Sequence, residues 1–306
     1  MPNTLINKIR DAVIGEKQAI HTSFGCKPLI YADYTASGRA LNFIEQYISQ
    51  QVLPFYANTH TETSYTGAQT TLLREQARDI IHRALKGCEE DQVIFCGSGA
   101  TSAINKLIDI LNLRLPADLA ERHQLLQHIP KNERAVVFIG PYEHHSNELP
   151  WRESTADLVV IPLDSNGQID FEVLDSKLQE YSERPLKIGS FSAASNVTGI
   201  KSDVDKISAL LHENDAQAFW DYAAAAPYVA IDMNATNDDK NCGKDAVFLS
   251  PHKFIGGPGT PGILVVKKHL LNNQVPAMPG GGTVMYVTPE DHQYTSNSVR
   301  REEGGT

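Results

Sequence analysis

Short apolar runs alternate along the chain with longer stretches in which apolar residues recur every three or four positions. Residues 93–97 form one such run, and after a Ser-Gly-Ala-Thr turn the apolar residues of 104–111 fall at helical spacing. The first pattern predicts buried strands and the second predicts amphipathic helices. The same alternation predicts further strands at 135–139, 158–163, 186–191, 218–221, 246–249 and 262–266, and further helices at 69–85, 171–181 and 203–213.

Repeated strand–helix units of this kind predict an α/β fold. We expect three layers, α/β/α, around a mixed sheet that is mostly parallel. Ahead of these units, the pattern predicts a helix over 1–20, a strand entering a polar turn over 28–38, and a helix over 41–53 that stops at Pro54. The segment 276–306 shows the least regular pattern.

Polar residues that could bind a ligand or take part in catalysis follow several of the predicted strands. In a parallel sheet, ligands bind beyond the carboxyl ends of the strands. Each residue also has an ordinary interpretation: a lysine reaching water, a turn asparagine, a capping aspartate, or a histidine pair that is solvated or binds zinc. The candidates are residues 98–101, His144 with His145, Asn196, Asp221, and residues 250–253 with Lys253.

Taken together, the candidates provide a turn suited to an anion, an aromatic ring, an amide, a carboxylate and a lysine. A Ser-Gly-Ala-Thr turn between a strand and a helix aims backbone N–H groups at an anion. Lys253 lies between an apolar run and a glycine-rich loop, where a lysine can become a nucleophile that forms Schiff bases. This set matches the needs of pyridoxal 5'-phosphate, which requires a lysine, a phosphate cradle and a carboxylate at its pyridine nitrogen.

Composition excludes several other classes of protein. The 306 residues carry a net charge of −10 and no run of lysine and arginine, so we expect no nucleic-acid partner. No apolar run approaches membrane-spanning length, so we expect no membrane partner. The four scattered cysteines and an N-terminus without a signal-peptide core favour a cytoplasmic location.

From about residue 31 to residue 306, an ordered set of motifs resembles the class V aminotransferase family of PLP fold type I. The nearest likeness is to cysteine desulfurases and selenocysteine lyases. In chain order, the motifs are Tyr-Ala-Asp-Tyr-Thr-Ala-Ser at 31–37, Ser-Gly-Ala-Thr at 98–101, Glu-His-His-Ser-Asn at 143–147, Ser-Asn-Val-Thr-Gly at 195–199, Trp-Asp at 220–221, Ser-Pro-His-Lys at 250–253, Gly-Gly-Gly at 280–282 and Glu-Gly-Gly-Thr at 303–306.

The resemblance implies a role for each matching residue. Lys253 would be the Schiff-base lysine, and His144 would stack on the PLP ring and take part in proton transfer. Asn196 would lie near the phenolic oxygen, and Asp221 would pair with the pyridine nitrogen. The family's threonine reaches the phosphate of the partner subunit, which implies a homodimer. The phosphate ligands implied are Gly99, Ala100, Thr101, Ser250, His252 and Thr306.

The chain departs from the family pattern at three places. Ala224 stands where the family often has a glutamine that bonds the phenolic oxygen, and 235–244 contains extra residues that we interpret as a surface insertion. The sequence ends at Thr306, before the small domain that carries the family's substrate-binding arginine and, in desulfurases, the sulfur-accepting cysteine. We therefore expect an N-terminal helical segment over 1–30 and a PLP-binding large domain over 31–306.

The resemblance implies an enzyme that acts on an amino acid, with a cysteine desulfurase or lyase first and a class V aminotransferase second. A desulfurase would also have a sulfur-acceptor protein as a partner. A different hypothesis is a non-catalytic dimerisation scaffold with the same fold, because one fold can host several functions. A nucleotide-binding oxidoreductase is disfavoured, because no glycine fingerprint follows the first strand.

Overall fold

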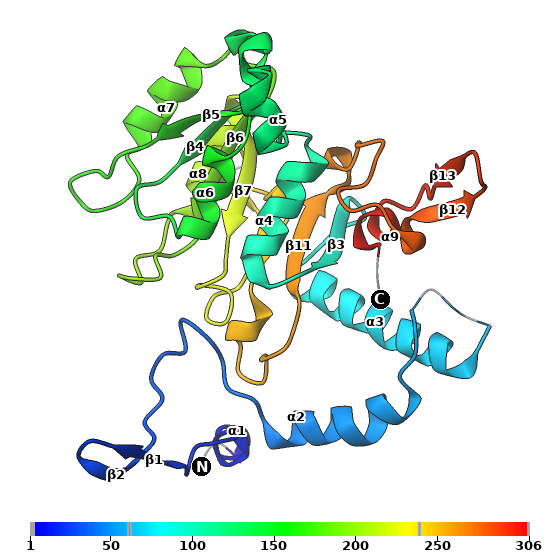
Figure 1. Ribbon diagram of the computed structural model, residues 1–306. Helices are drawn as coiled ribbons and strands as arrows, with labels where there is room; N and C mark the ends of the chain where they lie inside the picture. Colours follow the sequence, from blue (N-terminus) through cyan, green and yellow to red (C-terminus); the bar gives the residue numbers. More distant parts are fainter. Residues whose placement is uncertain (1–3, 60, 62, 238–239, 305–306) are drawn as a thin grey trace. The chain divides into compact units, whose positions relative to one another are not determined.

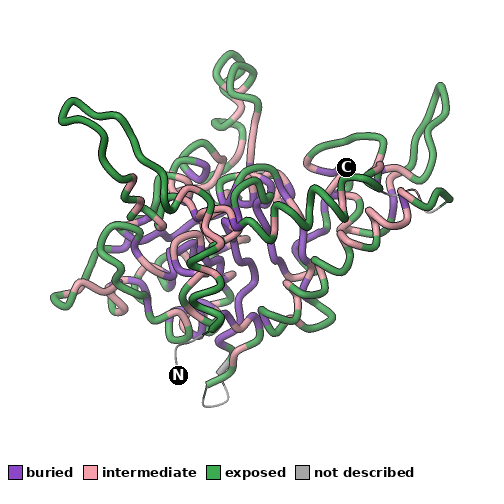
Figure 2. Tube along the Cα trace, turned by 90° about the horizontal axis from the view of Figure 1, so that it is seen from below, coloured by how far each residue is buried: buried purple, intermediate pink, exposed green. Residues whose placement is uncertain are grey.

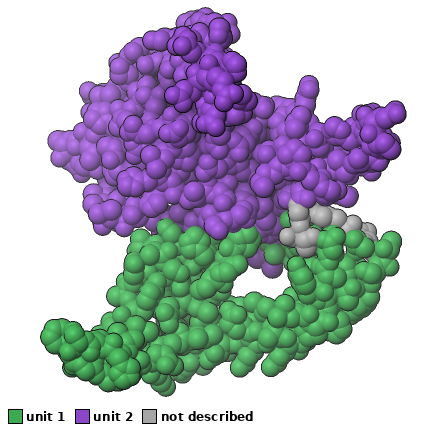
Figure 3. All heavy atoms as spheres, viewed as in Figure 1, with its two compact units in different colours: residues 1–77, 251–261, 306 green, residues 78–250, 262–305 purple. Residues whose placement is uncertain are grey.

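The computed structural model describes residues 4–59, 61, 63–237 and 240–304. It divides into two compact units (Figure 3). Unit 1 contains residues 1–77 and 251–261, and unit 2 contains residues 78–250 and 262–305. The two units are described in turn.

Unit 2 is built on a seven-stranded sheet (Figure 1). In spatial order, the strands are β3 (Asp91–Cys96), β11 (Gly262–Lys267), β10 (Ala246–Leu249), β7 (Gln217–Asp221), β6 (Lys187–Ser192), β4 (Val136–Ile139) and β5 (Asp157–Val160). β11 runs antiparallel to both of its neighbours, and the pairs among β10, β7, β6, β4 and β5 are parallel. The predicted sheet, mixed and mostly parallel, is therefore confirmed.

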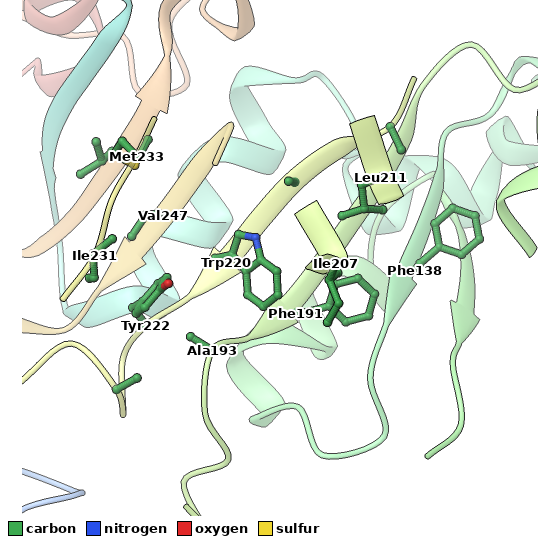
Figure 4. Packing of buried hydrophobic residues seen from close by; sticks show 14 of the residues in the cluster. Phe138, Phe191, Ala193, Ile207, Leu211, Trp220, Tyr222, Ile231, Met233 and Val247 are labelled. Atoms are coloured by element: carbon green, nitrogen blue, oxygen red, sulfur yellow. The ribbon is translucent and has the colours of Figure 1, made fainter. Parts of the chain in front are cut away.

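Helices cover both faces of this sheet because its strands are apolar on both faces. All four residues of β4 are buried, and they divide by alternation between two hydrophobic clusters. Val136 and Phe138 pack with residues of α7 (Phe171–Glu180) and α8 (Val204–Glu213) (Figure 4), whereas Val137 and Ile139 pack with α4 (Gly99–Ile110). The predicted three-layer arrangement is confirmed, and Figure 2 shows buried residues concentrated along the strands.

The helix starts follow the capping rules. The Asp203 side chain accepts a hydrogen bond from the backbone N–H of Lys206 at 3.3 Å, which confirms the expected cap of α8. Asp170 caps α7 in the same way, through Val173 at 3.0 Å. The remaining helices of unit 2 are α5 (Ala117–Arg122) and α6 (Leu149–Arg152), and α3 (Tyr65–Ala84) runs across the boundary of the two units.

The C-terminal segment is more ordered than its sequence predicted. It forms a hairpin of β12 (Val284–Val287) and β13 (His292–Tyr294), followed by α9 (Ser298–Glu303). Glu302 is fully buried and accepts hydrogen bonds from Asn273 and from the backbone of Ala277. Glu303 pairs with Arg78 and accepts the backbone N–H of Phe95, at the edge strand β3. Buried carboxylates, which helical or strand periodicity does not reveal, hold this segment in place.

Within 235–244, β8 (Thr236–Asn237) pairs antiparallel with β9 (Lys240–Asn241). The interpretation as a surface insertion holds for Thr236 and Asn237, which are exposed. It is wrong for Cys242 and Lys244, which are buried.

Unit 1 contains α1 (Thr4–Ala12), a hairpin of β1 (Ala19–Thr22) and β2 (Gly25–Pro28), and α2 (Asn42–Tyr47), which continues as a π-helical turn at Ile48–Val52 and a 3-10 turn at Leu53–Phe55. The predicted helix over 1–20 is too long. The observed helix α1 ends at Ala12, before Gly15, whose φ is +88°. Of the strand predicted to enter a polar turn over 28–38, the strand is wrong, because β2 ends at Pro28, whereas the turn is present at 34–36. That segment closes a turn in which the backbone of Asp33 and of Ser37 accepts the Tyr31 hydroxyl.

Candidate functional site

The candidate residues of unit 2 gather at one edge of its sheet. β10, β7, β6 and β4 are consecutive neighbours and parallel, so their carboxyl ends lie at the same edge. Ser250 follows β10, Asp221 ends β7, and His144 lies in the loop after β4. This is the edge at which ligands bind in open α/β sheets.

The N-terminus of α4 forms an anion cradle at this edge. Gly99 has a φ of +58°, and a Cβ on Gly262 would lie 2.1 Å from the Gly99 carbonyl oxygen, so the backbone approach requires glycine. The backbone N–H of Ala100 donates to the Ser250 hydroxyl at 2.8 Å, which joins α4 to the end of β10. Ser98 makes no side-chain cap among the described residues. The first turn of this 12-residue helix therefore directs N–H groups outward, and these residues fit a phosphate group.

Thr101 connects the cradle to the histidine loop. Its hydroxyl donates to the Ser146 hydroxyl at 2.7 Å, and the Ser146 N–H donates to Nδ1 of His144 at 3.1 Å. Because Nδ1 accepts, a neutral His144 carries its proton on Nε2. The His144 ring is exposed, so the loop presents an oriented ring N–H at the surface of unit 2.

Glu143, which was not among the predicted site residues, anchors this loop from inside. Its Oε1 accepts the backbone N–H groups of Gly140 at 3.3 Å and Ser192 at 3.1 Å. Its Oε2 accepts the Ser192 hydroxyl at 2.6 Å and Nδ2 of Asn147 at 2.8 Å. Four donors, from the loop after β4 and from the end of β6, thus converge on one buried carboxyl group.

The orientation of the Asn147 amide is fixed from its other side. Trp151 Nε1, which can only donate, faces Asn147 Oδ1 at 3.5 Å and the Ser190 hydroxyl at 3.1 Å. The Ser190 hydroxyl donates to Asn147 Oδ1 at 2.7 Å, and Asn147 Nδ2 donates to the Ser190 carbonyl at 3.1 Å. Asn147 therefore cannot turn its amide, and Glu143 Oε2 must act as an acceptor.

Two opposing effects set the pKa of Glu143. Burial raises the pKa to about 7, and the negative charge of Asp221 contributes to the increase. The hydrogen bonds from Ser192 and Asn147 act in the opposite direction, since they favour the ionised form. The interaction with Asp221 also places the histidine loop in electrostatic contact with the end of β7.

Asp221 is 5% exposed, and hydrogen bonds from both sides of the strand end help to hold it in position. Its Oδ1 accepts the N–H of Ala223 at 2.8 Å, and its backbone carbonyl accepts the N–H of Ala193 at 2.9 Å. These contacts place a buried carboxylate at the carboxyl end of a central strand.

Asn196 is less closely tied to the other candidates. It is exposed in a turn that the Ser195 hydroxyl closes by accepting the N–H groups of Val197 and Thr198, each at 3.2 Å. In the part of the chain that the structure describes, no hydrogen bond joins Asn196 to the other candidate residues. Its role stays a prediction.

Lys253 and His252 lie in the 3-10 turn Pro251–Lys253, which follows Ser250 directly and belongs to unit 1. The His252 carbonyl accepts the N–H of Gly38 at 2.8 Å. Burial lowers the pKa of His252, and the positive charge of Lys253 lowers it further. Thr306, the last predicted phosphate ligand, lies outside the described residues.

Among residues 4–59, 61, 63–237 and 240–304, no group of three or more histidine, cysteine, aspartate or glutamate side chains could hold a metal ion. Within the same described ranges, no helix is long and apolar enough to cross a membrane.

Residues 30–306 match the family described as Aminotransferase class-V. The chain belongs to this family. Curated class V relatives include the cysteine desulfurase of Synechococcus elongatus, which is 28% identical over 91% of this chain and 41% of its own length. A probable cysteine desulfurase of Halalkalibacterium halodurans is 28% identical over 91% of this chain and 63% of its own length. The chain therefore spans less than two thirds of the length of these relatives.

Solved structures share the class V fold of this chain. The apo cysteine desulfurase of Thermococcus onnurineus NA1 superposes with a TM-score of 0.74 at 21% identity, and the match covers 98% of this chain and 66% of that one. A NifS-like protein of Rickettsia africae superposes with a TM-score of 0.63 at 21% identity, and the match covers 90% and 66% of the two chains. At this identity, the likeness demonstrates the fold.

Proposed function

We propose that this chain is the PLP-binding large domain of an enzyme that acts on an amino acid, most like a cysteine desulfurase or lyase. The observation that carries the proposal is the cradle at the N-terminus of α4, which Ser250 closes. Asp221 is buried at the same edge of the sheet, and Lys253 follows Ser250 by three residues. The printed names of the curated relatives support the choice of reaction.

In this proposal, each side chain has a role that follows from its chemistry. Bound PLP would draw electrons from the substrate's Cα. The α4 N-terminus and Ser250 would hold its phosphate, and the buried carboxylate of Asp221 would keep its pyridine nitrogen protonated. Lys253 would form the covalent bond to the cofactor and later hold or release the proton at Cα.

His144 would lie against the cofactor ring with its proton on Nε2. The bond from Ser146 to Nδ1 supports this tautomer, and Ser146 is in turn held by Thr101 of the phosphate cradle. In this proposal, the loop that orients the ring and the turn that binds the phosphate form one hydrogen-bonded unit.

The wider context of the enzyme is part of the same proposal. We propose a cytoplasmic homodimer in which Thr306 reaches the partner's phosphate site, with residues 1–30 as an N-terminal segment. A sulfur-acceptor protein would be a further partner. These roles rest on the motifs at 143–147, 250–253 and 303–306.

The test is turnover of L-cysteine by the PLP-loaded protein in the presence of a thiol reductant. A desulfurase releases alanine and sulfide in equal amounts, whereas an aminotransferase requires a 2-oxo acid and releases no sulfide. Ser250→Ala removes the acceptor of the Ala100 N–H, and we expect it to weaken PLP binding about fivefold, the effect of one neutral hydrogen bond. Ser154→Ala, on a surface turn away from the cradle, is the control. A protein that takes up no PLP would support the scaffold alternative instead.

A further inference from the structure

A pocket lies on the face of the unit 2 sheet that α7 and α8 cover. It has a volume of about 310 Å³ and opens beside the start of α8, next to the ends of β6 and β7. Trp220 and Tyr222 pack in the cluster formed with α7 and α8, whereas Phe219 packs in the cluster formed with α4. Because side chains alternate along a strand, Asp221 points to the α4 face and Tyr222 to the α8 face. The pocket is therefore separate from the candidate cofactor site.

Tyr222, which lines this pocket, is a buried residue whose hydroxyl has no hydrogen-bond partner within the described chain. Its side chain is 4% exposed, and its hydroxyl makes no hydrogen bond within the described ranges of the chain. Burial raises the pKa of Tyr222 above its ordinary value, and the negative charge of Asp205 raises it further, so the hydroxyl keeps its proton at neutral pH. Because this hydroxyl donates to no group of the described chain, it is available to donate to an acceptor in the pocket.

Two lysines add positive charge beside that hydroxyl. Lys244 is 2% exposed, and its Nζ donates to Asp205 Oδ1 at 3.1 Å and to the Cys242 carbonyl at 3.2 Å. An ammonium group has three donors, so Lys244 retains one. Lys201 is exposed at the rim and forms no ion pair among the residues that the structure describes.

Carboxylates at the same pocket balance these cations. Asp203 uses Oδ1 to cap α8, which leaves Oδ2 for another donor. Asp205 is half exposed and engages Lys244 through Oδ1. Val204 and Val229 form apolar parts of the pocket lining. The pocket therefore offers donors for an anionic group and acceptors for a cationic group within one small volume.

We propose that this pocket binds a small zwitterion resembling a free amino acid. Its carboxylate would accept from the Tyr222 hydroxyl, Lys244 and Lys201, and its ammonium group would donate to Asp203 and Asp205. The volume lies at the lower end of the range for small-molecule sites, about 300–1,000 Å³. Because Tyr222 follows Asp221 directly, an occupied pocket would also restrain the backbone that positions Asp221. The proposal does not depend on the proposed enzymatic function.

The test uses L-proline as the probe and the full chain without added PLP. Proline is a zwitterion, and its secondary amine avoids the Schiff-base chemistry of primary amines. We expect saturable shifts of the Val204 and Val229 methyl signals in ¹³C NMR, with a dissociation constant in the millimolar range. Tyr222→Phe should weaken binding about fivefold, the effect of one hydrogen bond. Lys201→Ala should weaken it by about twofold to threefold, as for an exposed charge. Lys206→Ala is the control and should change nothing, because Lys206 does not line the pocket and its ammonium group lies over the Phe171 ring.

Three results would overturn the proposal. The first is the absence of saturable shifts with L-proline. The second is equal binding by the wild type and by Tyr222→Phe, which removes no hydrogen bond within the described chain and should leave the thermal midpoint unchanged. The third is equal binding of acetate or of methylammonium alone, which would indicate a simple ion site. PLP uptake is measured in a separate experiment. It tests the proposed enzymatic function, whereas L-proline binding tests the proposed zwitterion site, so the two proposals can fail independently.

Discussion

Replacement of Glu143 by glutamine tests whether burial or hydrogen bonding controls this carboxyl group. Four donors converge on Glu143, which favours its ionised form, whereas burial and the charge of Asp221 favour its protonated form. We predict that burial dominates and that Glu143 titrates near pH 7 in the folded protein.

The free-energy consequence follows from linkage. An increase of the pKa from its ordinary 4.5 to about 7 corresponds to about 3 kcal/mol. Because the folded state holds the proton more tightly, this contribution to stability is complete below about pH 4.5. It is lost as the pH rises to about 7 and is constant above. Glutamine does not titrate, so the wild type should lose about 3 kcal/mol relative to Glu143→Gln between pH 4.5 and pH 8.

Tryptophan fluorescence in urea measures this difference in unit 2 alone. The chain has two tryptophans, Trp151 and Trp220, and both are buried in unit 2. Glu148→Gln, which removes a partly exposed partner of Arg152, is the control and should show no such trend. A difference between the wild type and Glu143→Gln that stays constant with pH would refute the reasoning, because it would mean that the four donors keep Glu143 ionised throughout.

Two further substitutions test the packing around the site, each by urea unfolding. Gly262→Ala would place a Cβ 2.1 Å from the Gly99 carbonyl and should cost about 3 kcal/mol or more, whereas Gly281→Ala, with open space around it, should cost less than about 1 kcal/mol. Lys106→Met removes the buried cation beside Glu302 Oε2, leaves Arg301 as the cation beside Oε1, and should cost about 3 kcal/mol. An unchanged midpoint for Gly262→Ala or for Lys106→Met would contradict these packing arguments.

The central fold could be predicted because its pattern is local. The run Val136–Ile139 is apolar at every position, as expected for a strand covered on both faces, and Asp203 stands where a cap is needed. The strand predicted over 28–38 was wrong because its apolar residues precede a turn. The Tyr31 hydroxyl stabilises this turn, and Gly38 donates to the carbonyl of His252, which is far away in the sequence. Non-local contacts of this kind leave no periodic signal.

The candidate site also has features that the sequence predicted and features that it did not. The motif around Ser98 and the position of Asp221 at a strand end were visible in the sequence, because both depend on neighbouring residues. The importance of Glu143 was not, since two of its four donors come from Ser192 at the end of β6, far from Glu143 in the sequence. A glutamate four residues before a buried asparagine carries no distinctive signal. The pocket at Tyr222 was missed for a similar reason, because only the fold brings Lys201 and Lys244 to it.

The most direct test of the proposed function is to identify the residue that PLP modifies. The protein is incubated with PLP, reduced with borohydride, digested and analysed by mass spectrometry, with Lys253→Ala as the control. The proposal predicts a pyridoxyl group on the peptide that contains Lys253, and none at that position in the variant. Uniform low-level labelling of exposed lysines, with no preference for Lys253, would contradict the assignment of this chain as a PLP-binding domain.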